Sequence, residues 1–192
     1  MGKINLKNVT KEQKEYFREC LRNYCFIMEQ KSKIPLSEEF KNNFNNFYLK
    51  ARRLKNEYKP KYFKELNQRI KDTNISVEDF DNILNKLNKI TGAWEISITS
   101  KLMHTVNPDL PIFDSKVKNY LIKYEDVILS IYGKGEQRKQ AVLRAWCNLN
   151  NWYNNIEIKK SDWIDWFDKE FPEYKDRISA TKKVDFIIFC LS

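Results

Sequence analysis

The chain contains few residues that interrupt regular backbone structure, with four glycines and five prolines among its 192 residues. No stretch approaches the roughly 18 consecutive apolar residues of a membrane-spanning helix. Residues 1–7 lack the apolar core of a secretory signal, and Leu6 stands where a myristoylation signal carries Ser or Thr. We therefore expect a loop-poor, cytoplasmic protein without a membrane segment, and its 42% hydrophobic content favours a folded globule.

Residues that bind metals are also sparse. His104 is the only histidine, and the cysteines (Cys20, Cys25, Cys147 and Cys190) form no C-x-x-C pair. This spacing excludes an ordinary zinc site and a closely spaced iron–sulfur loop. We expect free, buried thiols and neither a metal nor another cofactor.

Positive charge is what the chain has in excess, with a net charge of +9. Residues 41–71 hold ten basic side chains and two acidic ones, interleaved with aromatic residues such as Phe47 and Tyr48. A basic stripe with aromatics suits a nucleic-acid phosphate backbone. The alternative is a solvated basic face that reflects a composition rich in lysine and asparagine; we favour nucleic acid.

Apolar residues recur at three-to-four spacing along most of the chain, which predicts an all-α fold. The expected helices cover residues 11–31, 37–58, 61–70, 76–91, 94–103, 114–122, 136–149, 161–171 and 180–191. The run 184–191 could also form a buried strand, but the sequence offers it no partner strand, so we expect a helix. We therefore expect residues 1–192 to form one multi-helix domain of about eight to ten helices. A division into two lobes, with a boundary near residues 72–76, stays open as an alternative.

A turn glycine separates two of these helices, at Gly92 after Ile90. Such a reversal needs positive φ, which glycine adopts without steric cost. The simple interpretation is a helix C-cap in a helical hairpin. The alternative is an anion site, because backbone N–H groups at the start of the next helix attract phosphate.

Asp114 follows Pro111-Ile112-Phe113 and stands where a helix N-cap is expected. A capping role alone would account for it. The same position also directs an ionised carboxylate out of the helix end, where it could stabilise a developing sugar cation.

Three features of this region are considered together: Ile90-Thr91-Gly92-Ala93-Trp94, the helix and loop through Ser100-Lys101-Leu102-Met103-His104 and residues 108–111, and Asp114. In this order they resemble the helix-hairpin-helix (HhH-GPD) DNA glycosylase superfamily, in particular its 8-oxoguanine-glycosylase-like branch. The resemblance covers about residues 77–125. It implies a central helix-hairpin-helix, binding of duplex DNA, and removal of a damaged or modified base with Asp114 as the catalytic carboxylate.

Two departures from the family pattern change what the resemblance implies. Trp94 replaces the second hairpin glycine, and Ile96 stands where bifunctional members carry a lysine nucleophile. Isoleucine cannot form a Schiff base, so the resemblance implies a monofunctional enzyme in which Asp114 activates water. Lys101 lies about one turn further along and could replace the nucleophile only if the helix register shifted.

Base excision requires a flipped nucleotide held in a pocket. We expect His104 and Trp146 to line that pocket, with Trp94, Trp152 and Tyr153 as further aromatic candidates; core packing is the ordinary alternative for each. The expected DNA contacts are Gly92, Ala93, Trp94, Lys101, Ser115, Lys116, Lys118, Lys134, Arg138 and Lys139. Two other functions stay open, a non-catalytic helix-hairpin-helix DNA-binding module and a helical interaction protein. The sequence predicts neither the base nor an oligomeric state.

Overall fold

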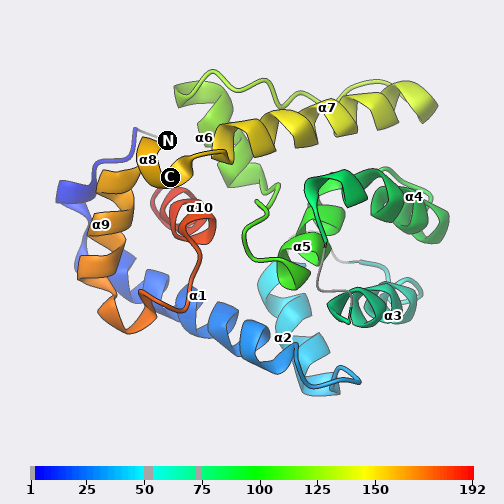
Figure 1. The fold of residues 1–192 in the computed structure, drawn as a ribbon, viewed down its shortest axis with the longest axis horizontal. Coiled ribbons are helices and arrows are strands. Elements are labelled where there is room, and N and C mark those ends of the chain that lie inside the picture. Colours follow the sequence, from blue (N-terminus) through cyan, green and yellow to red (C-terminus); the bar gives the residue numbers. More distant parts are fainter. Residues whose placement is uncertain (1–2, 50–53, 72–74) are drawn as a thin grey trace.

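The computed structural model describes residues 3–49, 54–71 and 75–192, and within these ranges it contains helices and no strand (Figure 1). The all-α prediction is confirmed. Three 3-10 helices lie at Leu6–Asn8, Val77–Asp79 and Pro172–Tyr174. The α-helices are α1 (Lys11–Gln30), α2 (Glu38–Tyr48), α3 (Lys59–Ile70), α4 (Phe80–Thr91), α5 (Ile96–Val106), α6 (Ser115–Tyr124), α7 (Gly135–Tyr153), α8 (Ile156–Lys159), α9 (Ser161–Glu170) and α10 (Ala180–Leu191).

The helix starts follow the capping residues of the sequence. Thr10 and Gln13 form a reciprocal capping box at α1, and the Ser37 hydroxyl accepts the Phe40 N–H at α2. Pro60 lies in the first turn of α3, where its missing N–H costs no hydrogen bond. Local sequence therefore decides where these three helices begin.

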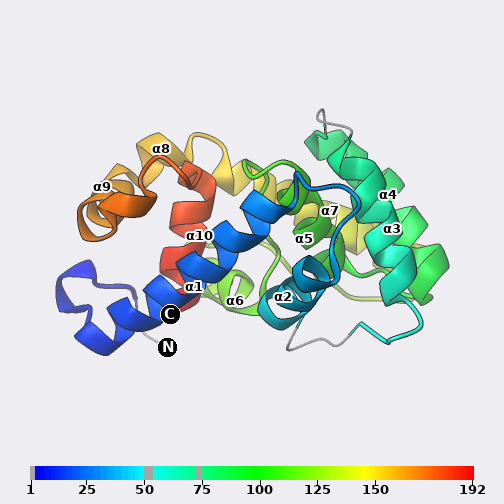
Figure 2. The same cartoon turned by 90° about the horizontal axis from the view of Figure 1, so that it is seen from below.

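Helix α10 is the centre of one half of the molecule. It packs against α1, α6, α8 and α9, and almost every residue from Thr181 to Ile188 is buried. Figures 1 and 2 show α10 enclosed by these helices. Residues 184–191 are helical, as the sequence predicts, because the run is covered by helices on several sides.

Helices α3, α4 and α5 pack together on the other side of the molecule (Figure 1). Helix α7 reaches this group through Trp146, which stacks on Phe80 with ring centroids 4.3 Å apart and donates its indole N–H to Val77 O. Among the described residues, a cluster of buried apolar side chains extends through both groups. The lobe boundary expected near residues 72–76 falls largely outside the described residues.

The expected helix over 37–58 is too long, because α2 ends at Tyr48. The Tyr48 carbonyl oxygen accepts a hydrogen bond from Lys101 Nζ at 2.7 Å. A tertiary contact from α5 thus satisfies a carbonyl at the end of α2. Residues 54–58 lead into α3 as a turn.

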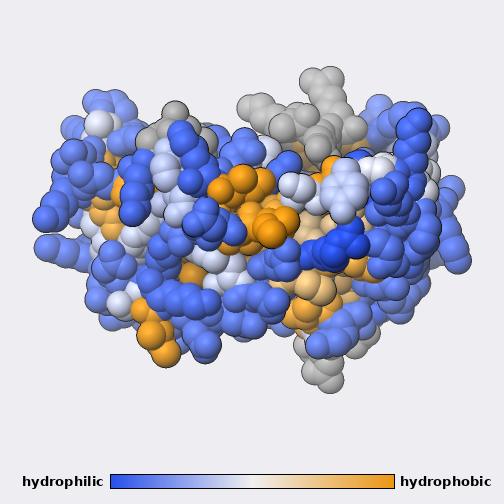
Figure 3. Space-filling model, turned by 90° about the horizontal axis from the view of Figure 1, so that it is seen from above, coloured by the Kyte–Doolittle hydropathy of each residue, from blue (hydrophilic) through white to orange (hydrophobic). Residues whose placement is uncertain are grey.

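The connection between α6 and α7 carries exposed apolar residues, Ile128 and Tyr132. It runs along the top of the molecule in Figure 1, and the view from that side is hydrophilic over most of its area, with apolar groups near its centre (Figure 3). Over the described ranges, no helix has the length and apolar character needed to cross a bilayer.

Candidate functional site

Asp114 is the N-cap of α6, as the sequence predicts. Its backbone is extended (φ −104°, ψ 154°), and its Oδ1 accepts the Lys116 N–H at 2.9 Å. The side chain is partly exposed rather than sealed under neighbours. The helix start therefore fixes the position of the carboxylate while leaving it in contact with solvent.

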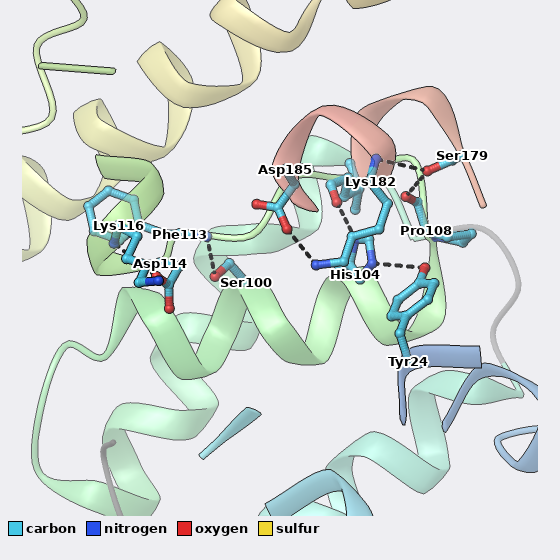
Figure 4. A network of polar contacts seen from close by, with 11 residues as sticks. Tyr24, Ser100, His104, Pro108, Phe113, Asp114, Lys116, Ser179, Lys182 and Asp185 are labelled. Carbon is cyan, nitrogen blue, oxygen red and sulfur yellow. Dashed lines mark hydrogen bonds and ion pairs between the residues drawn. The ribbon is translucent and has the colours of Figure 1, made fainter. Parts of the chain in front are cut away.

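The loop that delivers Asp114 is held by buried polar contacts from α5 (Figure 4). Ser100 Oγ accepts the Phe113 N–H at 3.0 Å, one residue before Asp114. His104 Nδ1 lies 2.6 Å from Leu110 O, further back in the loop. These contacts fix the backbone on which the carboxylate depends.

The His104 ring is fully buried, and its neighbours determine its tautomer. Because a carbonyl oxygen only accepts, Nδ1 carries the hydrogen and donates to Leu110 O, so Nε2 accepts from the Tyr24 hydroxyl at 3.1 Å. Burial lowers the pKa of His104 well below its usual value, and the nearby Lys182 ammonium acts in the same direction. His104 is a neutral structural link.

A cavity of about 460 Å³ opens beside Asp114, within the range of small-ligand pockets. We call it the Asp114 pocket. Its walls come from α1, α2, α5 and α10 and from the α6 N-cap. The lining residues are Tyr16, Glu19, Cys20, Asn23, Asn43, Asn46, Phe47, Tyr48, Lys101, Asp114 and Phe189.

A second, smaller cavity of about 40 Å³ adjoins the Asp114 pocket, and the two share Phe47, Tyr48, Lys101, Asp114 and Phe189. We call it the inner cavity. Its other lining residues are Ile112, Lys182, Asp185 and Phe186. Asp114 thus lies where an open pocket meets a narrower, more buried space.

The inner cavity contains a buried ion pair between Lys182 and Asp185, one helical turn apart on α10 (Figure 4). The Lys182 ammonium also lies 4.4 Å from the Phe186 ring centroid. Burial raises the pKa of Asp185, the negative charge of Asp114 adds to this, and Lys182 opposes it. The charge of Asp114 thus acts on the buried carboxylate of Asp185.

Lys101 is the second cation that lines the inner cavity, and it also lines the Asp114 pocket. Its side chain is buried, with 8% of the residue exposed, and Nζ donates to Tyr48 O. The sequence analysis placed Lys101 among the DNA contacts; the structure instead places it inside the protein on the wall that Asp114 shares. The reason is that α5 is buried along almost its whole length.

The thiol of Cys20 lines the Asp114 pocket, and a hydrogen bond with the Cys190 thiol lowers the pKa of Cys20. All four cysteines are free. Cys20, Cys25 and Cys190 are buried as expected, whereas Cys147 is exposed, which corrects the expectation of four buried thiols.

His104 and Trp146, expected to line the base pocket, lie in the core and line neither the Asp114 pocket nor the inner cavity. His104 is enclosed between α1 and the loop, and Trp146 stacks on Phe80. Their aromatic character serves packing. The pocket aromatics are other residues, namely Tyr16, Phe47, Tyr48, Phe186 and Phe189.

Two of the lysines expected to contact DNA are engaged within the protein. Lys116 Nζ donates to Phe189 O at the end of α10 and lies over the Phe189 ring. Lys139 forms an ion pair with Asp81 at 2.9 Å and lies 5.6 Å from the Trp94 ring centroid. The structure thus brings Lys139 and Trp94 together, outside the Asp114 pocket.

The remaining expected contacts lie near the surface. Ser115, Lys134 and Arg138 are exposed, and Lys118 is half-buried.

Gly92 ends α4 in the left-handed conformation (φ 73°), as predicted. Its N–H donates to Asn88 O, and the Ala93 N–H donates to Thr91 Oγ1. These two amides are therefore used within the turn. Ile96, which the resemblance aligns with a lysine nucleophile of other proteins, is buried in the first turn of α5.

The sequence analysis does not predict Lys182 and Asp185 as site residues, although the sequence contains a signal for them. Asp185 interrupts the apolar run 184–191, and an isolated carboxylate in a helix expected to be buried needs a partner. The sequence indicates Phe47 and Tyr48 only as part of the basic stripe. Their place beside Asp114 depends on how α2 packs, which local sequence does not encode.

Among the described residues, no group of three or more His, Cys, Asp or Glu side chains is arranged to hold a metal ion. Comparison with protein families, with curated proteins and with solved structures finds no match to the chain.

Proposed function

We propose that the protein is a monofunctional DNA N-glycosylase that removes a damaged or modified base, with Asp114 as its catalytic carboxylate. The observation that carries the proposal is that Asp114, fixed by the α6 N-cap, lines a pocket of about 460 Å³ with aromatic walls. A flipped nucleoside needs both a carboxylate near its sugar and room for its base.

The proposed reaction is hydrolysis of the bond between the sugar C1′ and the base nitrogen. That bond breaks, the base leaves with the bonding electrons, and a cation develops on the sugar ring. The ionised Asp114 stabilises this cation and accepts a proton from the attacking water, whose oxygen bonds to C1′. The departing base gains a proton from solvent.

The aromatic side chains of the pocket support this proposal. Phe47 and Phe189 lie on the wall that the Asp114 pocket shares with the inner cavity. An aromatic face is a suitable surface for a nucleobase, because stacking tolerates any base. A base held there would leave its sugar on the solvent side, toward Asp114.

Water, rather than a lysine, is the proposed nucleophile. Ile96 carries no amine, and the ammonium of Lys101 already donates to Tyr48 O. A reactive lysine must be deprotonated and free to form a Schiff base. We therefore expect base removal without strand cleavage.

The test uses duplex oligonucleotides, each with one modified base such as 8-oxoguanine, hypoxanthine or uracil. Released base is measured by mass spectrometry, and abasic sites are measured by strand cleavage with alkali. We expect release from at least one duplex, loss of at least about a hundredfold in rate for Asp114→Asn, and intact strands until alkali is added.

The matched control is Asp109→Asn, which removes a carboxylate from the exposed part of the same loop. It should leave the rate unchanged. Asparagine is a good N-cap, so Asp114→Asn should keep the start of α6 and the fold. Failure of every duplex to release a base, or full activity of Asp114→Asn, would disprove the enzymatic proposal. A borohydride-trapped covalent complex would instead indicate an amine nucleophile.

A non-catalytic DNA-binding module is the second candidate function, supported by the turn at Gly92 between the contacting helices α4 and α5 and by the exposed charges of Lys134 and Arg138. In that case, duplex binding would be strongly salt-dependent, Asp114→Asn would leave it unchanged, and no base would be released. A helical interaction protein would bind DNA weakly even at low salt.

A further inference from the structure

Two residues that line the inner cavity each carry a buried polar atom with no hydrogen-bond partner within the described part of the chain. The atoms are Tyr48 Oη and Asp185 Oδ1. Tyr48 is 7% exposed and Asp185 is 3% exposed. Buried polar atoms are almost always hydrogen-bonded, so two of them around one cavity indicate a missing partner.

The two atoms have different bonding requirements. The Asp185 Oδ2 is paired with the Lys182 ammonium, so Oδ1 is the acceptor of an ionised carboxylate and needs a donor. The Tyr48 hydroxyl can donate or accept. Together they offer a ligand one acceptor and one group that can donate or accept.

The size of the inner cavity fits the edge of a ligand rather than a whole ring. At about 40 Å³ it has room for a small polar group. The adjoining Asp114 pocket, at about 460 Å³, has room for the ring itself. The aromatic residues Phe47 and Phe189, which belong to both spaces, lie where a planar ring would pass from one to the other.

We propose that Tyr48 and Asp185 recognise the base itself, by accepting its edge N–H at Asp185 Oδ1 and by bonding the adjacent acceptor through Tyr48 Oη. This inference rests on the proposed function and names the substrate class of the same site. The substrates are bases whose edge keeps an unblocked N–H, as in oxidised or deaminated bases. Bases alkylated at that nitrogen are excluded, because a methyl group would leave Asp185 Oδ1 unpaired.

The first experiment measures binding of free bases to the full chain by ligand-observed NMR, without DNA or catalysis. Two pairs of probes differ only in N–H donors, hypoxanthine against 1-methylhypoxanthine and adenine against N6,N6-dimethyladenine. We expect the unmethylated member of at least one pair to bind at least about tenfold more tightly. Absence of binding by all four probes, or equal affinity within both pairs, would overturn the proposal.

The second experiment uses Tyr48→Phe, which removes only the hydroxyl. Because that hydroxyl has no partner in the described structure, thermal stability should not fall. Affinity for the preferred base should fall about tenfold. The matched control is Tyr153→Phe, whose hydroxyl is also buried without a partner among the described residues but lines neither cavity. It should bind the base as the unmodified protein does, and equal affinity of Tyr48→Phe would contradict the proposal.

The two proposals fail in different ways. Binding of a free base that depends on Tyr48 and on the N–H, without release of any base from DNA, would refute the glycosylase activity alone. Base release that is insensitive to Tyr48→Phe and to N–H methylation would refute this recognition scheme alone.

Discussion

The hydroxyl of Tyr24 donates to His104 Nε2 across 3.1 Å, so α1 and the loop before Asp114 are joined through a neutral imidazole. The other ring nitrogen donates to Leu110 O. Donation by Tyr24 requires an Nε2 without a proton, whereas donation to Leu110 O requires a proton on Nδ1. The link between α1 and the loop therefore depends on the protonation state of one buried side chain.

Acid should destabilise the protein through His104. Burial lowers its pKa in the folded state, whereas the unfolded chain has the ordinary value of about 6.5. Below that value the unfolded state binds a proton that the folded state does not. The contribution of His104 is therefore complete above pH 6.5 and is lost, by up to about 1.4 kcal/mol per pH unit, as the pH falls below it. Urea unfolding at several pH values measures the slope.

Comparison with His104→Asn isolates this contribution, because asparagine does not titrate and its amide can still donate to Leu110 O. The variant should be less stable at pH 7.5, and its stability should depend less on pH between 6.5 and 5. His104 is the only histidine, so NMR of its imidazole nitrogens reports its pKa directly. An imidazole that titrates near 6.5 in the folded protein would contradict the prediction.

Ser100→Ala should reduce stability by about 1–2 kcal/mol, because the buried Phe113 N–H would lose its acceptor. If Asp114 is catalytic, the rate of base release should also fall, since Phe113 precedes Asp114 in the held loop. Thermal unfolding and the base-release assay provide the two measurements. Ser115→Ala is the control: Ser115 is exposed and next to Asp114 on its other side, so both quantities should change little.

The secondary structure of this chain is largely predictable from local signals. The cap of Asp114, the left-handed Gly92 and the helical run 184–191 follow from residue chemistry within a few positions. The end of α2 does not, and there the Tyr48 carbonyl accepts a hydrogen bond from Lys101, 53 residues away in the chain.

The lining of the candidate site is less predictable for the same reason. Asp114 is predictable as a site residue because its position at a helix start is a local feature. Tyr48, Lys182 and Asp185 reach the same space from α2 and α10, and only the packing of both helices against α1 brings them together. His104 and Trp146 are the opposite case: the sequence predicts them in the pocket, but they pack in the core. An aromatic residue near a motif can serve either role.

Gly92→Ala should destabilise the protein by about 1 kcal/mol, because alanine is strained at φ 73°. The added Cβ would meet no atom within 4 Å, so the cost is conformational rather than steric. Gly92→Asn should cost less, since asparagine tolerates the left-handed region. Chemical denaturation of the three proteins gives this order, and an equal loss for both variants would show that the glycine is needed for another reason.

The exposed basic residues at the start of α7 should account for more of any DNA binding than Lys116. Lys134 and Arg138 are exposed, whereas Lys116 donates to Phe189 O and is committed to the end of α10. A phosphate contact contributes about −0.9 to the slope of log K against log salt. Lys134→Met and Arg138→Met should therefore each make the slope shallower by about that amount, with unchanged stability.

Lys116→Met should instead lower stability by about 0.5–1.5 kcal/mol and leave the slope unchanged. Fluorescence anisotropy with a labelled duplex at four salt concentrations measures the slopes, and thermal unfolding measures the stability. The reverse pattern would mean that Lys116 leaves α10 to bind phosphate, and that the DNA path follows the start of α6 rather than that of α7.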